Sequence, residues 1–383
     1  MSHPNRHVGI LVDTSDTWGR NIVESACRFA QDQGWTLLIS PRDAQGRLRV
    51  PRVWKGHGLI AALRGRGSVE HVRRLGLPVV DVSRAMKKED WFARVTTNDH
   101  VRAELAVGHL VSRGIQHFAC YAPAIGRYSD HRSVEFVASV EAQGLTCATY
   151  QHHGTGDAWL TNYAAVSKWL AGLPRPLGVL AGDPYPARQL IEICSVQSIR
   201  VPDDVAIISG DDDELLCNVA MPRISSIELA SHQIGVKAVS LLDRMMRGKS
   251  VSMQTYEIPP LGIRARESTD IVAIDSPEIA AAVRFIRDNA CEGIGVADVA
   301  KASHVSRRTL EYRFQELLRC APAEHIRRVR FERVRRLLVD TKMSIETIAF
   351  NCGFASGASL AQSYKKYYHE TPGYTRRSAS SRR

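Results

Sequence analysis

The chain of 383 residues is too long for one ordinary core, so we expect two or three folding units. Its 51 Lys and Arg outnumber its 40 Asp and Glu, and no stretch reaches the ~18 uninterrupted apolar residues of a membrane helix. No hydrophobic run of signal-peptide length precedes the first apolar segment. These totals predict a soluble, cytoplasmic protein with no membrane partner. Its eight cysteines are scattered without any C-x-x-C pair, which predicts reduced thiols in the core.

Short apolar runs alternate with amphipathic stretches over the first two thirds of the chain. The runs are residues 8–13, 36–40, 58–63, 79–83, 117–123, 178–182 and 205–210. Several of the stretches between them end in glycine, as helices with a C-terminal cap do. The alternation predicts an α/β fold of doubly wound parallel sheets with helices on both faces. In such sheets a ligand binds at the carboxyl ends of the strands.

Polar residues follow these predicted strands. Asp13 ends the first run and Asp16 and Trp18 follow it, Asp183 comes after 178–182, and Asp211 with Asp212 after 205–210. Carboxylates accept pairs of hydroxyls, and an aromatic face covers the apolar side of a sugar ring. Any single aspartate is explained equally well as a helix N-cap. Several converging on one crevice nevertheless predict a site for a small sugar.

Signals of enzymatic chemistry are missing from the sequence. No G-x-G-x-x-G follows VGILVD, and no G-x-x-x-x-G-K-[ST] occurs anywhere. His152 and His153 are adjacent, so they point apart in regular structure, and they have no third ligand at metal spacing. There is no nucleophile elbow. We therefore expect no catalytic residue, no cofactor and no metal.

Residues 176–242 and the stretch RSVEFVASVEAQGL (132–145) resemble the effector domain of LacI-type repressors and periplasmic sugar-binding proteins. The resemblance covers about residues 6–267 and implies a two-lobed sensor over 1–267. Its sugar contacts would include Asp183, Asp211, Asp212 and Arg132, with Tyr128 shortly before the helix that carries Arg132. Glu135 stands where the family usually has glycine. The fold implies three crossings between the lobes, near residues 98–101, 226–231 and 252–256.

A connector over residues 268–278 leads into a wholly helical pattern. Residues 279–383 hold 20 Lys and Arg against 10 Asp and Glu, which leaves 31 against 30 for the rest of the chain. This region contains two similar units, each with a short helix, a tight turn and a second helix. Ser306 and Ser356 stand at the N-caps of the second helices. A basic tandem helix-turn-helix predicts binding to double-stranded DNA.

The helical spacing predicts which residues of the second helix in each unit would face the major groove of DNA. In the first unit they are Arg307, Arg308, Glu311, Tyr312 and Gln315, opposite the apolar face of the helix. In the second unit they are Ser356, Ala358, Ser359 and Gln362, followed by Lys365 and Lys366 as phosphate contacts. Arginine can bind guanine O6 and N7 together, whereas alanine touches only thymine methyls. We therefore expect the first unit to carry most of the sequence discrimination.

An arginine-rich helix joins the two units, and we expect its arginines to divide evenly between phosphate contacts and structural pairs. The helix would hold the second helices of the two units in successive segments of the major groove. The pattern S-x-x-x-L-x-x-x-F at 306–314 and I-x-x-I-A-x-x-C-G-F at 345–354 resembles the DNA-binding domain of AraC-type regulators over about 279–378. Tyr312 and Val334 depart from that family's usual arginine and alanine.

A LacI-like sensor followed by an AraC-type domain resembles xylose operon regulators over nearly the whole length. The resemblance implies a transcription activator, a homodimer that works with RNA polymerase, and a pentose effector such as D-xylose. One departure leaves another sugar open, because Arg64 follows the run 58–63 where an acidic residue would bind hydroxyls. A different class also stays open, namely a non-regulatory sugar-binding protein whose basic tail binds RNA. Gel shifts with the upstream DNA of a sugar-catabolism gene would distinguish the two classes.

Overall fold

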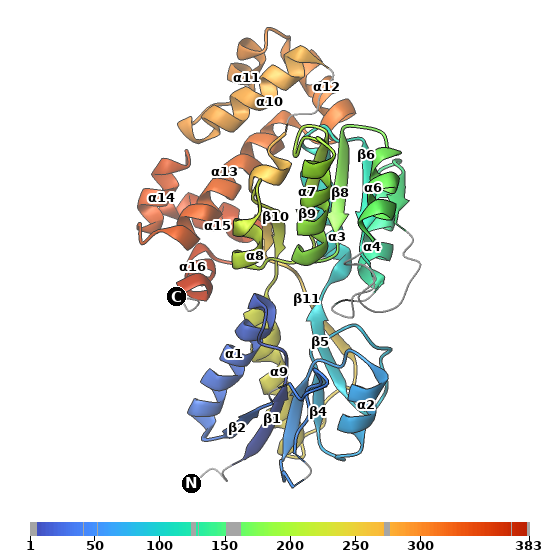
Figure 1. The fold of residues 1–383 in the computed structure, drawn as a ribbon. Helices are drawn as coiled ribbons and strands as arrows, with labels where there is room; N and C mark the ends of the chain where they lie inside the picture. The colour runs from blue at the N-terminus through green and yellow to red at the C-terminus, as the bar shows by residue number, and fades with distance from the viewer. Residues whose placement is uncertain are drawn as a thin grey trace.

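The structure is a computed structural model that describes residues 6–40, 42–51, 53–123, 128, 130–150, 162–271, 276–368 and 370–380. Over these residues the chain folds into two α/β lobes and a helical domain that lies along the second lobe (Figure 1). The predicted fold class, doubly wound parallel sheets followed by a helical domain, is confirmed.

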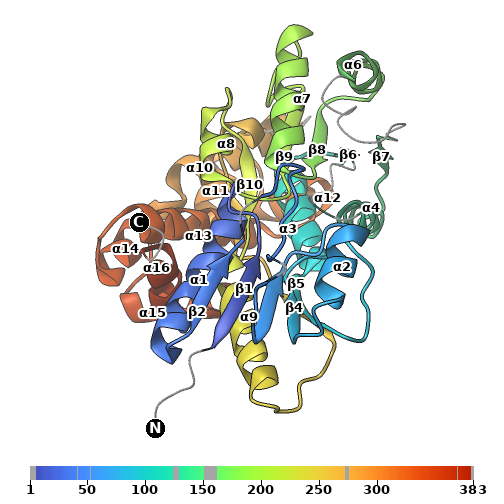
Figure 2. The ribbon, with the colours of Figure 1, turned by 60° about the horizontal axis from the view of Figure 1, so that its bottom comes forward.

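The N-terminal lobe is a parallel sheet covered on both faces. Its strands lie in the order β11 (Thr255–Ile258), β5 (Ala93–Thr97), β4 (Val79–Asp81), β3 (Gly58–Ala61), β1 (His7–Leu11) and β2 (Thr36–Ile39). Because successive strand residues point to opposite faces, Ile60 packs with α1 (Thr17–Gln33) and α9 (Ser231–Met246), whereas Leu59 packs with α2 (Arg66–Arg73). Figure 2 shows these helices on the two sides of the sheet.

The C-terminal lobe has the same architecture. Its strands lie in the order β12 (Gly262–Arg264), β10 (Ser225–Glu228), β9 (Val205–Ser209), β8 (Leu177–Ala181), β6 (His117–Tyr121) and β7 (Cys147–Thr149), and β12 is antiparallel to β10. Phe118 packs with α3 (Asp99–Val111) and α4 (His131–Glu141), and its neighbour Ala119 packs with α6 (Tyr163–Ala171) and α7 (Pro184–Val196). A short helix, α8 (Glu214–Val219), follows β9.

The apolar runs predicted as strands are strands in the structure, but the sequence did not reveal β5. This strand reads ARVTT, and its residue Arg94 is buried beside Asp81 of β4 with 2.8 Å between Nε and the carboxylate. Burial raises the pKa of Asp81, and Arg94 opposes that shift. Strands were predicted from runs of apolar residues, and the charged Arg94 interrupts such a run in β5.

The chain crosses between the lobes after β5, after β10 and after β11. The first two crossings agree with the expected ranges, whereas the third lies at residues 259–261 and not at 252–256. The reason is that β11 first extends the N-terminal sheet by pairing with β5. Backbone hydrogen bonds join the crossings, since Asn98 N donates to Ile258 O (2.9 Å) and Leu261 N to Glu228 O (2.7 Å).

The sensor extends further than its expected end at residue 267. Ser268 and Thr269 form a short 3-10 helix, η1 (Glu267–Thr269), and are buried against β9 and β10. Ser268 Oγ donates to Ile207 O, and Thr269 Oγ1 lies 2.7 Å from Ser225 Oγ. The first residues of the expected linker therefore belong to the C-terminal lobe, and residues 272–275 of that linker lie outside the described part of the chain.

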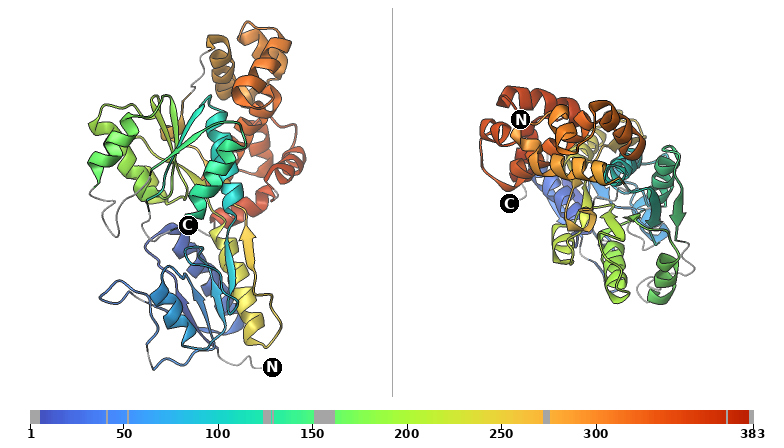
Figure 3. Two further views of the ribbon diagram at one scale, coloured as in Figure 1. Left: turned by 90° about the vertical axis from the view of Figure 1, so that its right-hand side faces the viewer. Right: turned by 90° about the horizontal axis from the view of Figure 1, so that it is seen from above.

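The helical domain contains both predicted helix-turn-helix units. Its elements are α10 (Pro277–Asn289), η2 (Ala290–Glu292), α11 (Val296–Ala302), α12 (Arg307–Leu318), α13 (Pro322–Asp340), α14 (Ile345–Asn351), α15 (Gly357–Tyr368) and α16 (Pro372–Ser380). Leu310 and Phe314 fill the core of the first unit, and Leu360 and Tyr364 that of the second. Helix α13 joins the units and lies against the C-terminal lobe (Figure 3). We call α12 and α15 the recognition helices and α13 the linker helix.

Candidate effector cleft and nucleic-acid interface

A cleft lies between the lobes, where the strands of both sheets end. Its lining comes from both lobes and consists of Asp16, Trp18, Arg64, Val82, Ser83, Arg84, Thr96, Thr97, Asp99, Arg102, Tyr128, Arg132, Asp183, Asp211 and Leu229. Carboxylates that accept hydrogen bonds alternate here with guanidinium groups that donate them. A sugar hydroxyl can do both, so this lining can bind each hydroxyl from two sides.

Six of the eight predicted sugar contacts line this cleft: Asp16, Trp18, Tyr128, Arg132, Asp183 and Asp211. Two of the aspartates also cap helices, as the alternative explanation required. Asp16 accepts from Gly19 N (2.7 Å) at the start of α1, and Asp183 accepts from Tyr185 N (3.0 Å) at the start of α7. The cap fixes the carboxylate at the strand end, so the two roles are compatible.

Asp13 and Asp212 were also predicted as sugar contacts, but neither is among the residues that line the cleft. Asp13 is bound by Arg42 and by Ser15, whose Oγ lies 2.9 Å away. Burial raises the pKa of Asp13, but the hydrogen bonds from Arg42 and Ser15 outweigh it and lower the pKa. Asp212 pairs with Arg264 (3.4 Å) and Arg266 (3.0 Å), two residues outside the lining of the cleft.

Arg132 of α4 lines the cleft and is held in place by several contacts. Its guanidinium donates to Gly182 O and to Asp211 (3.1 Å), and it lies 4.8 Å from the centroid of the Tyr128 ring. Burial alone would disfavour the charge, but Asp211 and Asp99 outweigh it and raise the pKa of Arg132. The guanidinium is therefore fixed and charged where a ligand oxygen would lie.

The sequence missed the part of the lining that follows β3, β4 and β5. Asp99 pairs with Arg102 at 2.8 Å, Arg84 pairs with Glu257 at 2.8 Å, and the Arg64 guanidinium lies 5.3 Å from the Trp18 ring centroid. Thr96, Thr97 and Asp99 could not be found because β5 itself was not predicted. Arg64 was visible only as a departure from the expected acidic residue.

The recognition helix of the first unit presents its predicted contacts to solvent. Ser306 caps α12 by accepting from Thr309 N (3.1 Å), as predicted. Arg307, Arg308, Glu311, Tyr312 and Gln315 are all exposed. Arg307 is engaged within the helix, because its Nε lies 2.9 Å from Glu311. Arg308 makes no hydrogen bond or ion pair within the described part of the chain, so its guanidinium is available to a partner.

The recognition helix of the second unit approaches its neighbour closely. Gly357 N donates to Glu346 Oε2 (2.9 Å), and a Cβ at this position would meet that oxygen at 2.3 Å. Glycine here therefore lets α14 cap α15. Of the predicted contacts, Ala358, Ser359, Gln362, Lys365 and Lys366 are exposed and Ser356 is half-buried.

Three arginines of the linker helix make contacts within the protein, and phosphate contacts stay a prediction for the other three. Arg328, Arg330 and Arg335 make structural contacts, since Arg330 donates to Ala290 O (2.6 Å) and Ile294 O (2.9 Å) and Arg328 to Gly108 O (3.3 Å). Arg327, Arg333 and Arg336 are exposed. Phe331 of the same helix is fully buried and packs with Phe354 and three tyrosines.

Within the described ranges, no group of three or more His, Cys, Asp or Glu could hold a metal ion. His152 and His153 lie outside those ranges. Among the described helices, none is long and apolar enough to span a bilayer.

Comparisons with known proteins support the fold assigned to each of the two parts of the chain. Residues 107–269 match a periplasmic binding protein-like domain, and residues 299–378 match a helix-turn-helix domain. The xylose operon regulatory protein of Escherichia coli K12 is 27% identical over 377 residues, or 96% of each chain. The protein of the same description from Haemophilus influenzae is 27% identical and covers 97% of this chain and 98% of its own.

Solved structures give the same result. A structure described as the xylose-binding transcription activator xylR is 26% identical and covers 98% of this chain and 99% of its own, with a TM-score of 0.63. A ribose-bound LacI family regulator from Enterococcus faecium, 18% identical, shares the sensor fold over 69% of this chain and 98% of its own, with a TM-score of 0.53. The chain is thus a homologue of xylose operon regulators over nearly its whole length, with a periplasmic-binding-protein-like domain that precedes a helix-turn-helix domain.

Proposed function

We propose that this regulator binds a pentose, D-xylose first among them, in the interlobe cleft and then activates transcription of sugar-catabolism genes. The observation that carries the proposal is the convergence of Asp16, Asp183, Asp211 and Arg132 with Trp18 at the strand ends of both lobes. Full-length relatives described as xylose regulators supply the choice of sugar.

Binding of a sugar requires the cleft to change shape. Its free volume is about 50 Å³, which is room for one or two water molecules. A sugar must therefore displace side chains such as Arg64 and Arg84 or separate the lobes. Ligand binding is then coupled to lobe position, and a ligand shifts such an equilibrium only by its different affinity for the two arrangements.

A thermal-shift screen tests the sugar site. Purified protein is heated with D-xylose, L-arabinose, D-ribose and D-glucose, each well above its expected dissociation constant. A sugar that binds the folded protein at about 100 times its dissociation constant stabilises it by about 2.7 kcal/mol. We expect D-xylose to raise the melting temperature most. A panel in which no sugar raises it would refute the cleft as a sugar site.

The DNA-binding half is tested separately. We propose that the protein acts as a homodimer whose recognition helices bind repeated half-sites, and that the bound dimer recruits RNA polymerase. Sedimentation of the protein with DNA gives the subunit number, and transcription in vitro with and without D-xylose separates activation from repression. A protein that binds RNA as tightly as the upstream DNA of a sugar-catabolism gene would instead be the non-regulatory alternative.

A further inference from the structure

The linker helix is attached to the sensor at its hinge. Arg335 of α13 donates to Glu228 from Nη2 (3.0 Å) and Nε (3.2 Å), and its Nη1 donates to Leu261 O. Glu228 ends β10 immediately before the second lobe crossing, and Leu261 lies in the third. The DNA-binding domain therefore contacts two of the three segments that must change conformation whenever the lobes move.

This contact is buried. The side chains of Arg335 and Glu228 are 5% and 6% exposed. Burial alone would disfavour the charged guanidinium, but Glu228 outweighs it and raises the pKa of Arg335. Separating two charges that are this buried, without a substitute partner for either, is unfavourable. When Glu228 moves, Arg335 has to follow it or lose this ion pair.

The same arginine touches a recognition helix. Its guanidinium lies 5.2 Å from the ring centroid of Tyr368, the last residue of α15. Gly262, the residue after Leu261, lies so close that a Cβ there would meet Arg335 Nη1 at 2.9 Å. Arg335 thus connects the hinge backbone, the linker helix and the second recognition helix by direct contacts.

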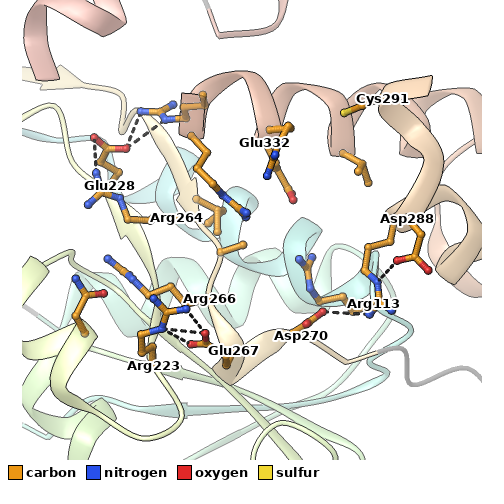
Figure 4. A pocket seen from close by; sticks show the side chains of 18 of the residues that line it. Arg113, Arg223, Glu228, Arg264, Arg266, Glu267, Asp270, Asp288, Cys291 and Glu332 are labelled. Carbon is orange, nitrogen blue, oxygen red and sulfur yellow. Dashed lines mark hydrogen bonds and ion pairs between the residues drawn. The ribbon is translucent and has the colours of Figure 1, made fainter. Parts of the chain in front are cut away.

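The other side of the hinge strand faces the effector cleft. Leu229 lines the cleft, and it directly follows Glu228. Successive residues of an extended chain point to opposite sides, so a displacement of this segment by a ligand moves both side chains. Asp212 supports the arrangement from the neighbouring strand end, because it holds Arg264, which also lies 3.8 Å from Glu228. Figure 4 shows Glu228 and Arg264 together at one end of the crevice between the sensor and the linker helix.

From these contacts we infer that the Arg335–Glu228 pair couples the effector cleft to the DNA-binding domain. Sugar binding moves the hinge, Glu228 carries Arg335 with it, and the linker helix with both recognition helices changes position relative to the sensor. This inference rests on the proposed function, since it needs a ligand that binds the interlobe cleft. Arg335 is a positioning residue that contacts neither sugar nor DNA.

The test compares the coupling in variants of the full-length protein. A duplex is first selected from random DNA by the wild-type protein with D-xylose present. The dissociation constant for this duplex is then measured by fluorescence anisotropy with and without D-xylose, and that for D-xylose by calorimetry with and without the duplex. Thermodynamic linkage requires the sugar effect on DNA affinity and the DNA effect on sugar affinity to be the same factor. For the wild type we expect a factor of about 5 to 150.

Replacing Arg335 by methionine keeps an unbranched apolar stem and removes the charge. For Arg335→Met and for Glu228→Gln we expect both factors to fall to within about twofold of 1, whereas sugar affinity measured without DNA stays within about threefold of wild type. Arg335→Lys retains a charge near Glu228 and should restore part of the coupling. Arg336→Ala is the matched control, because Arg336 lies in the same crevice, is exposed and makes no hydrogen bond or ion pair within the described ranges.

The outcomes separate the two proposals. A wild type that responds to D-xylose and an Arg335→Met variant that responds equally would overturn the coupling and leave the proposed function intact. An equal loss of coupling in Arg336→Ala would also overturn it, because any charge in the crevice would then serve. A wild type whose DNA affinity no pentose changes would overturn both proposals. If Arg335→Met fails to fold, as judged by circular dichroism, Glu228→Gln decides the matter alone.

Discussion

Replacing Arg308 by alanine should weaken binding to the specific DNA site without affecting the fold or the sugar site. Arg308 lies on the exposed face of α12 and makes no hydrogen bond or ion pair within the part of the chain that is described, so its removal costs the protein no internal contact. A bidentate contact from arginine to guanine is worth about 1–3 kcal/mol, or roughly 5- to 150-fold in affinity. Arg307 is the matched control, because Glu311 already engages its guanidinium at 2.9 Å.

Fluorescence anisotropy at one fixed salt concentration, with the selected duplex and with a scrambled duplex, measures the effect. We expect Arg308→Ala to lose affinity for the selected duplex only, and Arg307→Ala to lose less. The unfolding free energy should stay within about 0.5 kcal/mol of wild type, because the side chain is exposed. An equal loss on both duplexes, with the salt dependence reduced by about one phosphate contact, would show that Arg308 binds the backbone and does not read bases.

Three further predictions follow from buried or cleft residues. Asp183→Asn keeps the helix cap but removes a charged acceptor, which should weaken D-xylose binding by about 1.5–3 kcal/mol in calorimetry. Asp13→Asn is the control and should leave the affinity for D-xylose unchanged. Equal losses of affinity in the two variants would refute the structural assignment of the cleft. Phe331→Ala should destabilise the second helix-turn-helix unit by about 3–5 kcal/mol in calorimetric melting, whereas the exposed Phe350→Ala should change stability by less than about 0.5 kcal/mol. Burial, with Arg328 and Arg113, lowers the pKa of His325 from 6.5 to about 3. Between these two pH values the unfolded chain binds a proton at His325 that the folded chain does not bind. The free energy of unfolding therefore falls as the pH drops from 6.5 toward 3. The slope contributed by His325 is about 1.4 kcal/mol per pH unit, and urea unfolding of His325→Leu between pH 6 and 4 should lack it; an unchanged slope would contradict the prediction.

The sequence by itself determined the order of domains and the type of each. Apolar runs indicated β1, β3, β8 and β9 because these strands are largely buried on both faces and consist almost entirely of apolar residues. The helix-turn-helix repeat was equally visible, since its cores need apolar residues at fixed helical spacing and its caps need serine. The exposed positions of α12 then followed from periodicity alone.

Only the tertiary structure decided how the site and the interface are assembled. The sequence could not show that Asp13 and Asp212 pair with Arg42 and Arg264 outside the lining of the cleft, because a strand end fixes a residue's position but not the partner of its side chain. It could not reveal β5, whose buried Arg94–Asp81 pair removes the apolar pattern. The sequence also gave no sign of the contact between Arg335 and the hinge. One arginine among many on the linker helix became distinct only when folding placed it beside Glu228, 107 residues away in the sequence.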